Sequence, residues 1–304
     1  MTGAIETFGL TKTYGGTTAV ADLNLRVEAG QVFGFLGPNG AGKSTTIRML
    51  LALQRPTRGR AALLGLDAAA DSVEVHRRVG YLPGDLELFP RLTGREHIAW
   101  FARARDIDAG SAAGQLIDRF QVVVDRPVRE LSKGNRQKIG LVLAFMHRPE
   151  LLVLDEPTSG LDPLMQHEFE NLLRETVAKG RTVFLSSHEL AEVQRIADRI
   201  AIIKAGRLVV EDTVDGLRRA APQKMEVRFS RSIDPAEFSA VRGVTVTASD
   251  GPRVTLDVTG EIAPVLKVIA SHDPVDLISR PPGLDELFLG FYRGSTDGEA
   301  SRAR

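Results

Sequence analysis

The chain has 304 residues, of which 43% are apolar and 26% charged, and its 39 basic side chains balance 39 acidic ones. A net charge of zero argues against nucleic acid as the main partner, because such binding depends on an excess of Lys and Arg facing phosphates. The sequence contains no cysteine, which excludes disulfides, thiol chemistry and a Cys-based zinc site. Because no apolar run approaches the roughly 18 residues that a membrane span needs and the N-terminus lacks signal-peptide features, we expect a protein on the cytosolic side.

From the N-terminus to about residue 215, strand-like runs alternate with helical patterns. This alternation is typical of an α/β fold with a mostly parallel sheet. Within this part, residues 84–148 have few strand signals and several helical ones, so they are predicted to be a helical insertion. The expected strands lie near 4–8, 18–27, 31–36, 60–64, 79–82, 151–154, 182–186, 199–203 and 207–210, and the expected helices of the insertion lie at 94–105, 111–120 and 134–147.

Beyond residue 220 the hydrophobic pattern changes. Alternating apolar residues at 225–229 and 254–258 predict strands, and helical spacing at 262–269 and 284–292 predicts helices. The order strand–helix–strand–strand–helix–strand fits a small split-βαβ domain that ends in a closing helix at 284–292. The expected organisation is therefore a first domain at 1–220, a small α/β domain at 221–293 and a disordered tail at 294–304.

Residues 37–44 form a complete phosphate-loop motif, G-x-x-x-x-G-K-S. An apolar run that reads as a strand comes before it and a predicted helix follows, which is the context that this motif requires. Backbone N–H groups of such a loop turn toward phosphate oxygens, Lys43 reaches the β- and γ-phosphates, and the Ser44 hydroxyl helps to hold Mg²⁺. A purely structural glycine turn is the alternative, but the context favours binding of a nucleoside triphosphate with Mg²⁺. The residues assigned to this site are Gly37, Pro38, Asn39, Gly40, Ala41, Gly42, Lys43, Ser44 and Thr45.

Two carboxylates follow the apolar run at 151–154. Asp155 is expected to hold Mg²⁺ opposite Ser44, and Glu156 to polarise a water aimed at the γ-phosphate. A strand that ends in solvated carboxylates is common, so the pair alone leaves a structural interpretation open. The segment 157–162 that follows favours the catalytic interpretation.

The segment Leu131–Gln137 opens a predicted helix. Ser132 and Gly134 at its start can offer a hydroxyl group and unencumbered N–H groups to an anion. Ser132 can equally act as the N-cap of the helix, and the two roles are compatible.

Taken together, these segments resemble an ATP-binding cassette (ABC) transporter ATPase. The resemblance covers roughly residues 4–215, and it depends on the order and spacing of specific motifs. These motifs are the phosphate loop, LSKGN at 131–135, LLVLDEP at 151–157, SGLD at 159–162, and His188 at the end of the next strand. The fold that the resemblance implies is a P-loop NTPase cassette with a RecA-like core and antiparallel β and helical subdomains.

The same resemblance implies roles for individual residues. The family forms head-to-tail dimers, in which Ser132 and Gly134 of one subunit contact the γ-phosphate bound by the other, and Asp162 lies at the seam. His188 would hydrogen-bond the γ-phosphate and help to hold Glu156, which makes His188 catalytic together with Glu156 and Lys43. Tyr14 would stack on the adenine; the alternatives are a core role for Tyr14 and an ordinary helix-entry role for His188.

The chain departs from the family pattern at two places. Gly84 stands where the family usually has a Gln that contacts Mg²⁺ and senses the membrane partner, and Asp85 or Glu87 could substitute for it. In the signature, Lys133 and Asn135 stand where Gly and Gln are commoner. Lys133 either adds positive charge near the phosphates or points to solvent.

The resemblance also implies a biological role. This subunit would work with a separate membrane permease, at the cytoplasmic face of the membrane, and residues 85–90 resemble the surface that receives the coupling helix of the permease. Its variant motifs and short C-terminal domain resemble ATPases that export drugs and antibiotics. The alternative is a non-transport ABC protein acting on ribosomes or DNA, although such proteins generally have two cassettes or a long coiled coil, and this chain has neither. A third hypothesis makes the C-terminal module a regulatory binding domain.

Overall fold

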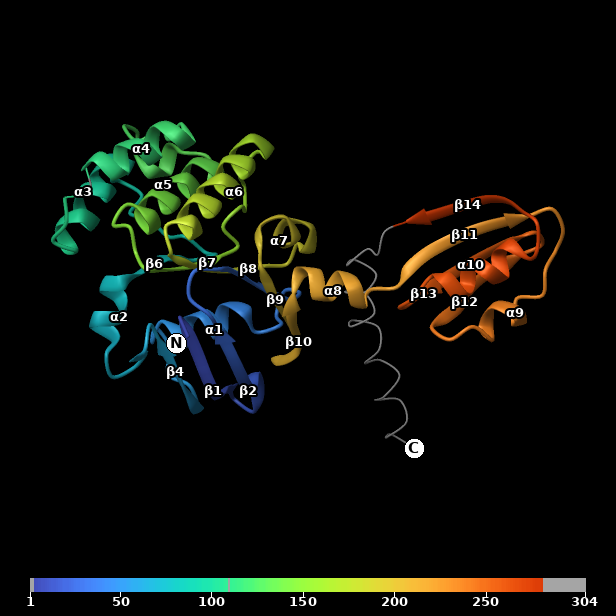
Figure 1. Ribbon diagram of the computed structural model, residues 1–304. Helices are drawn as coiled ribbons and strands as arrows, with labels where there is room; N and C mark the ends of the chain where they lie inside the picture. Colours follow the sequence, from blue (N-terminus) through green and yellow to red (C-terminus); the bar gives the residue numbers. More distant parts are fainter. Residues whose placement is uncertain (1–2, 109, 281–304) are drawn as a thin grey trace. The chain divides into compact units, whose positions relative to one another are not determined.

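The computed structural model describes residues 3–108 and 110–280 (Figure 1). The chain divides between Glu211 and Asp212 into two compact units, ahead of the boundary expected after residue 220. The helix at 214–220 therefore belongs to the second unit.

The centre of the first unit is a six-stranded sheet with the order β10-β9-β3-β8-β7-β6. The pairs β3/β8, β3/β9, β6/β7 and β7/β8 are parallel, as expected for an α/β fold. Every residue of β3 and β7 is buried, which explains why both strands read as continuous apolar runs. The strands are β3 (Val32–Leu36), β6 (Val79–Leu82), β7 (Leu151–Asp155), β8 (Thr182–Ser187), β9 (Arg199–Lys204) and β10 (Arg207–Thr213).

A second, antiparallel sheet has the order β2-β1-β4-β5. Its strands are β1 (Ile5–Tyr14), β2 (Thr17–Val27), β4 (Arg58–Leu63) and β5 (Leu66–Asp67). Strand β1 is longer than the strand expected at 4–8, because its register shifts carry it past Gly9, which has φ 58°, and interrupt the alternation that a sequence pattern can detect. The two sheets confirm the mixed α/β class expected for an ABC cassette.

Helices of the first unit cover both faces of the six-stranded sheet, and α3 and α4 pack on other helices. In Figure 1, α6 and α7 lie on one side of this sheet and α1 lies on the other. The expected insertion is helical: α3 begins at a capping box between Thr93 and Glu96, and α5 begins with Ser132 as its N-cap. The helices are α1 (Lys43–Leu50), α2 (Ser72–Arg78), α3 (Gly94–Ala104), α4 (Gly110–Phe120), the 3-10 turn η1 (Val128–Glu130), α5 (Lys133–Phe145), α6 (Pro163–Ala178) and α7 (Leu190–Ile196).

The second unit has the predicted split-βαβ order within the described residues. Its antiparallel strands are arranged as β12-β13-β11-β14, and its core includes Phe229, Phe238 and Leu256. The closing helix predicted at 284–292 and the tail lie outside the described residues. The elements are α8 (Val214–Ala220), β11 (Gln223–Phe229), α9 (Ala236–Ser239), β12 (Val244–Asp250), β13 (Arg253–Val258), α10 (Ala263–Ala270) and β14 (Pro274–Arg280).

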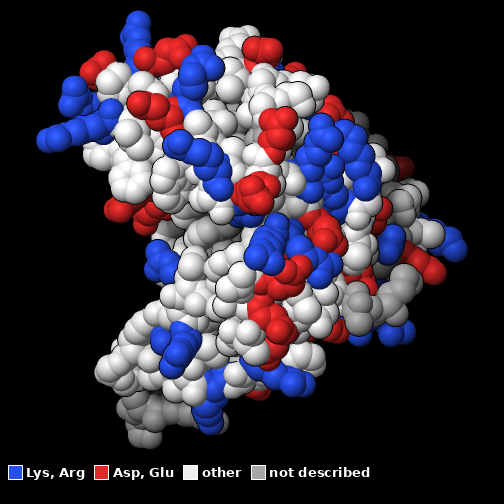
Figure 2. Space-filling model, turned by 90° about the vertical axis from the view of Figure 1, so that its left-hand side faces the viewer, with Lys and Arg blue, Asp and Glu red and all other residues white. Residues whose placement is uncertain are grey.

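The surface is mixed in charge. Figure 2 shows that basic and acidic side chains are interspersed over the face it presents. The zero net charge is therefore not the sum of two separated regions of opposite sign on that face, and the exclusion of nucleic acid stays a prediction. In the described part of the chain, none of the helices has both the length and the apolar character needed to cross a bilayer.

Candidate nucleotide-binding site

The phosphate loop connects the end of β3 to the start of α1, as its motif predicts. Gly42 has φ 107°, and a Cβ atom there would lie 2.5 Å from the carbonyl oxygen of Ala19, so this position requires glycine. Helix α1 begins at Lys43 and has no side-chain cap. The first N–H groups of the helix are therefore available to an anion.

The ammonium group of Lys43 lies inside this loop. The side chain is only 6% exposed, and its Nζ donates hydrogen bonds to the carbonyl oxygens of Gly37 at 2.6 Å and Pro38 at 3.3 Å. Nζ also lies 3.4 Å from Oε1 of Glu156. A bound triphosphate would replace these three acceptors with phosphate oxygens.

Asp155 ends β7 and is nearly buried, with 3% exposure. Strands β7 and β8 pair so that Asp155 lies opposite Ser186, and the Ser186 hydroxyl donates a short hydrogen bond to Oδ1 of Asp155. This bond holds one of the two carboxylate oxygens of Asp155 in place. Ser186 was not predicted to take part in the site, although a polar residue near the end of a buried strand was an available signal.

Glu156 follows directly after the strand and turns into the pocket with φ 50°. Its Oε2 lies 2.7 Å from Nδ1 of His188, and its Oε1 faces Lys43. The Glu156 side chain is 23% exposed and His188 is 49% exposed, so water reaches both. A carboxylate held between an ammonium group and an imidazole has a fixed orientation, which a general base needs.

These groups line one pocket of about 640 Å³. The structure thus brings together most of the predicted phosphate-loop residues with the two carboxylates and His188. Arg48 on α1, which was not predicted, adds a cationic group, and Lys133 also lines the pocket while its Nζ donates to Ser159 Oγ at 2.9 Å. The predicted residues in the lining are Pro38, Asn39, Gly40, Gly42, Lys43, Ser44, Thr45, Asp155, Glu156 and His188.

The oxygen donors of the pocket fit a magnesium ion. Ser44 and Asp155 line the same cavity, and hydroxyl and carboxylate oxygens are ligands that Mg²⁺ prefers. Among the residues described, no group of three or more His, Asp or Glu side chains could hold a metal by itself. Mg²⁺ usually binds through one or two carboxylates together with substrate phosphates, which agrees with this arrangement.

Of the signature, Lys133 lines this pocket, whereas Ser132 and Gly134 do not, and neither does Asp162. Ser132 Oγ accepts a hydrogen bond from Asn135 N at 3.2 Å, which is the capping role left open by the sequence. Gly134 packs so closely on Gly160 that a Cβ atom would lie 2.4 Å from the Gly160 carbonyl oxygen. Asp162 caps α6 by accepting from Met165 N at 3.0 Å. The contact of Ser132 and Gly134 with a γ-phosphate across a dimer interface stays a prediction.

Tyr14 lies outside the pocket lining. Its ring is 43% exposed, its hydroxyl donates to Gln54 Oε1, and the Lys12 ammonium lies 5.1 Å from the ring centroid. An exposed ring excludes the alternative of a core residue. Stacking on adenine stays a prediction.

One buried carboxyl group, that of Glu192, was not predicted from the sequence. Glu192 on α7 is 6% exposed, and its Oε2 accepts a hydrogen bond from Ser187 Oγ at 2.8 Å. Its Oε1 is buried without a hydrogen-bond partner among the described residues. Burial raises the pKa of Glu192; the hydroxyl groups of Thr158 and Ser187 oppose the shift, and the carboxylates of Glu189 and Glu156 add to it. Its position four residues after His188 was the only available signal.

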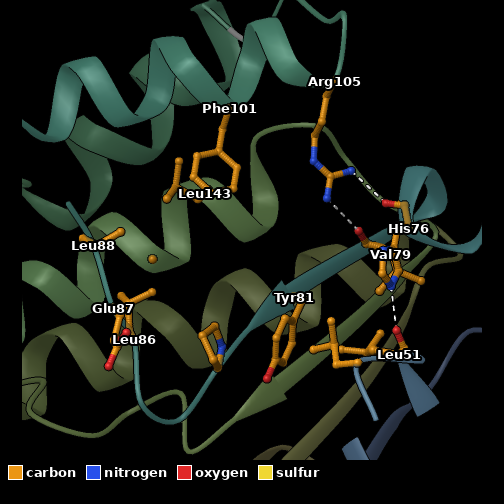
Figure 3. Close-up of a pocket in the computed structure, with 13 residues that line it drawn as sticks. Leu51, His76, Val79, Tyr81, Leu86, Glu87, Leu88, Phe101, Arg105 and Leu143 are labelled. Atoms are coloured by element: carbon orange, nitrogen blue, oxygen red, sulfur yellow. Dashed lines mark hydrogen bonds between the residues drawn. The ribbon is translucent and has the colours of Figure 1, made fainter. Parts of the chain in front are cut away.

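A second cavity, the apolar groove, adjoins the nucleotide pocket. Figure 3 shows it between the insertion helices and β6, with Arg105 donating to the carbonyl oxygens of His76 and Val79 at one end. Its volume is about 310 Å³. Glu87 lines this groove, whereas Asp85 lines the nucleotide pocket beside Gly84. Of the two residues expected to substitute for the missing Gln, only Asp85 therefore faces the nucleotide, and its substitution stays a prediction. The lining is Leu51, Leu53, His76, Val79, Tyr81, Pro83, Leu86, Glu87, Leu88, Phe101, Arg105, Gly140 and Leu143.

A strand–glycine loop–helix that carries Lys43, with Asp155 and Glu156 at the end of a neighbouring parallel strand, defines a P-loop nucleoside triphosphatase. Comparison with known proteins narrows this class. Residues 20–159 match the family model described as ABC transporter. The chain is 39% identical over 315 residues to the daunorubicin/doxorubicin resistance ATP-binding protein DrrA of Streptomyces peucetius, covering 99% of this chain and 96% of that protein.

Two further similarities agree. The bacitracin transport ATP-binding protein BcrA of Bacillus licheniformis is 38% identical over 234 residues, covering 76% of each protein. A solved ATP-binding subunit of an ABC transporter superposes with a TM-score of 0.64 at 32% identity, covering 71% of this chain and 92% of that structure. The chain belongs to the ABC transporter family; it is an ATP-binding and ATP-hydrolysing subunit of the exporter type. ATPases of this family work as dimers with membrane permease components. None of these relatives supports the alternative of a ribosome- or DNA-acting protein.

Proposed function

We propose that this subunit uses ATP hydrolysis to drive the efflux of drugs, antibiotics or other hydrophobic compounds through a separate permease. The observation that supports the motor most directly is the convergence of Lys43, Asp155, Glu156 and His188 on one pocket. Drug export is supported by the similarity to DrrA, which extends over both units of this chain.

In the proposed reaction each residue has a separate task. Lys43 leaves the carbonyl oxygens of its own loop and binds the β- and γ-phosphates. Glu156 polarises the attacking water, and His188 keeps the Glu156 carboxylate in place through the 2.7 Å contact and hydrogen-bonds the γ-phosphate. Ser44 and Asp155 would hold Mg²⁺, which supplies charge neutralisation for the phosphates.

The proposed active form is a head-to-tail dimer. In one copy the pocket contains a single phosphate loop; the exposed Ser132 caps its own helix, and the half-buried Gly134 packs on Gly160. In the dimer these two residues would complete the pocket of the other copy from the γ-phosphate side, and Asp162 would lie between the two sites. ATP then joins the subunits and its hydrolysis releases them.

The proposed contact with the permease is the apolar groove and the aromatic surface beside it. Phe89 and Trp100 are 58% and 48% exposed, and their rings meet edge to face at 6.3 Å. Exposed aromatic rings beside an apolar groove are characteristic of a protein interface. This contact would hold the subunit at the cytoplasmic face of the membrane.

Co-purification tests this proposal. The subunit is expressed with an affinity tag, the membrane protein that accompanies it is identified, and ATPase activity of the complex is measured with a panel of apolar drugs. The expected result is a rate that a drug stimulates and that Lys43→Ala abolishes. If no membrane protein accompanies the subunit and no compound changes the rate, the export proposal fails.

A further inference from the structure

The apolar groove and the nucleotide pocket have a wall in common. Three residues line both cavities: Leu53, Tyr81 and Pro83. Of these, only Tyr81 has a polar side-chain group. Tyr81 is therefore the side chain of this shared wall that can form hydrogen bonds.

Tyr81 is fixed in the sheet beside the strand that carries Asp155. It lies on β6, opposite Val153 of β7 in the parallel ladder. Figure 3 shows its ring under the groove, with the hydroxyl on the side away from Phe101 and Leu143. Burial raises the pKa of Tyr81 to about 12, with a further contribution from the Asp155 carboxylate and an opposing one from Arg48. The hydroxyl thus lies within the electrostatic reach of two side chains of the nucleotide pocket, and it remains a donor at neutral pH.

This hydroxyl has no fixed partner. Among residues 3–108 and 110–280, no side-chain hydrogen bond involves Tyr81, although its ring is partly buried. The Tyr81 hydroxyl is not among the buried polar atoms that lack a partner, and Tyr81 lines the open nucleotide pocket, so water reaches this hydroxyl. The hydroxyl can therefore exchange water for an acceptor in the nucleotide pocket.

Near Tyr81, the position at which the family usually has a Gln is occupied by a glycine, so no side chain there competes with the Tyr81 hydroxyl. Gly84 supplies no side chain, and a Cβ atom at this position would lie 3.2 Å from Oδ2 of Asp155, which is tighter than ordinary van der Waals contact. Asp85 lines only the nucleotide pocket and Glu87 only the groove. Neither carboxylate spans the wall as the Tyr81 side chain does.

We propose that Tyr81 couples the groove to the nucleotide pocket: an occupant of the groove packs on its ring, and its hydroxyl then donates to Asp155 or to a phosphate oxygen. The inference rests on the proposed function only in taking the groove as the permease contact. Coupling is reciprocal for equilibrium binding, so nucleotide in the pocket must also restrict the ring. Tyr81 acts here as a positioning residue, because it transmits the state of the groove to the residues that bind nucleotide.

The absence of cysteine in the chain makes a direct test possible, because one introduced cysteine can be alkylated specifically. Leu88→Cys places a thiol in the groove, and N-phenylmaleimide attached there serves as a surrogate occupant. Val73→Cys, on α2 and 69% exposed outside the groove, is the matched control. Dissociation constants for the magnesium complex of AMP-PNP are measured with and without the label, each with Tyr81 or with Tyr81→Phe.

With Tyr81 present, the groove label is expected to change the dissociation constant at least about fivefold, the lower end of ordinary allosteric coupling. The label at position 73 should change it less than about twofold, and Tyr81→Phe should reduce the effect of the groove label to the same level. An equal effect of the groove label in Tyr81→Phe, or no effect with Tyr81 present, would overturn the proposal.

A second measurement does not depend on the Tyr81→Phe variant. The chain has three tyrosines, so 3-fluorotyrosine gives three ¹⁹F signals, and Tyr14→Phe and Tyr292→Phe identify the Tyr81 signal by exclusion. This signal should shift on labelling in the groove and again on nucleotide binding; a signal that responds to neither refutes the coupling. Both measurements use the isolated full-length subunit, so their failure is distinct from a failure to find a permease.

Discussion

Replacing Glu156 with Gln should slow hydrolysis and at the same time tighten ATP binding. The substitution removes the negative charge but preserves the size of the side chain. Loss of a positioned general base typically costs about 10²- to 10⁴-fold in rate. The gain in affinity follows from the contact between Glu156 Oε1 and Lys43 Nζ, because this carboxylate competes with phosphate for the ammonium group.

The size of the gain can be worked from the 3.4 Å separation of these two atoms. Coulomb's law gives about 1 kcal/mol at the dielectric constant of water and about 5 kcal/mol at an effective value of about 20. Glu156 is 23% exposed, so screening by water favours the lower part of this range. A release of about 1 to 2 kcal/mol corresponds to roughly 5- to 30-fold tighter binding of ATP.

Calorimetric titration with the magnesium complex of AMP-PNP measures the affinity, and phosphate release measures hydrolysis. Glu189→Gln is the control, because that neighbouring carboxylate is 68% exposed and lies 3.8 Å from the other nitrogen of His188. It should change neither quantity by more than about twofold. Wild-type hydrolysis in Glu156→Gln would refute the general-base role, and an unchanged affinity would refute competition for Lys43. Size-exclusion chromatography with ATP should show Glu156→Gln as a dimer.

Three further predictions concern buried groups. Burial, reinforced by neighbouring guanidinium groups, lowers the pKa of His147 to about 4, so the folded state resists its protonation. The stability that is present above about pH 6.5 is then lost as the pH falls toward 4. Between pH 7 and pH 4.5, the free energy of unfolding of the wild type, measured in urea, should fall on the order of 1–2 kcal/mol more than that of His147→Gln. Equal losses in the two proteins would contradict this prediction. Because the pKa of Glu192 is raised in the folded state, the wild type loses stability as the pH rises from about 4.5 through the raised value. By pH 8, the free energy of unfolding of Glu192→Gln, relative to the wild type, should have increased on the order of 1 kcal/mol. Melting-temperature profiles that stay parallel for the two proteins would exclude this. Gly42→Ala should weaken nucleotide binding more than Gly40→Ala, because both have positive φ but only the Cβ atom at Gly42 would collide with a neighbour; equal dissociation constants for the two variants would contradict the collision.

The sequence predicted the residues that act within one continuous motif. The phosphate loop, the Asp155–Glu156 pair and His188 each follow a buried strand of the same parallel sheet, and the carboxyl ends of parallel strands meet at one edge. The parallel arrangement of these strands is therefore enough to predict that these residues lie close together. The split-βαβ order of the second unit was predictable because its strands and its longer helix differ in hydrophobic periodicity.

Features that depend on the packing of distant segments were not predictable. The contact of Ser186 with Asp155 depends on the register between β7 and β8, which neither strand shows by itself. The buried state of Glu192 depends on how α7 lies against the end of β8, and acidic residues near helix starts are usually exposed. The capping bonds of Ser132 and Asp162 are local and were predictable, but a second subunit is needed to test their roles at the γ-phosphate.

Lys43 links these observations. Its ammonium group is satisfied within the protein by two carbonyl oxygens and by Glu156, and Glu156 is in turn held by His188. In the proposed reaction, a triphosphate displaces Glu156 from Lys43 as it binds, and the displaced carboxylate then receives a proton from the attacking water. The contact between Lys43 and Glu156 therefore opposes nucleotide binding and keeps the Glu156 carboxylate in the pocket. For this reason, Glu156→Gln should increase the affinity for ATP and decrease the rate of hydrolysis.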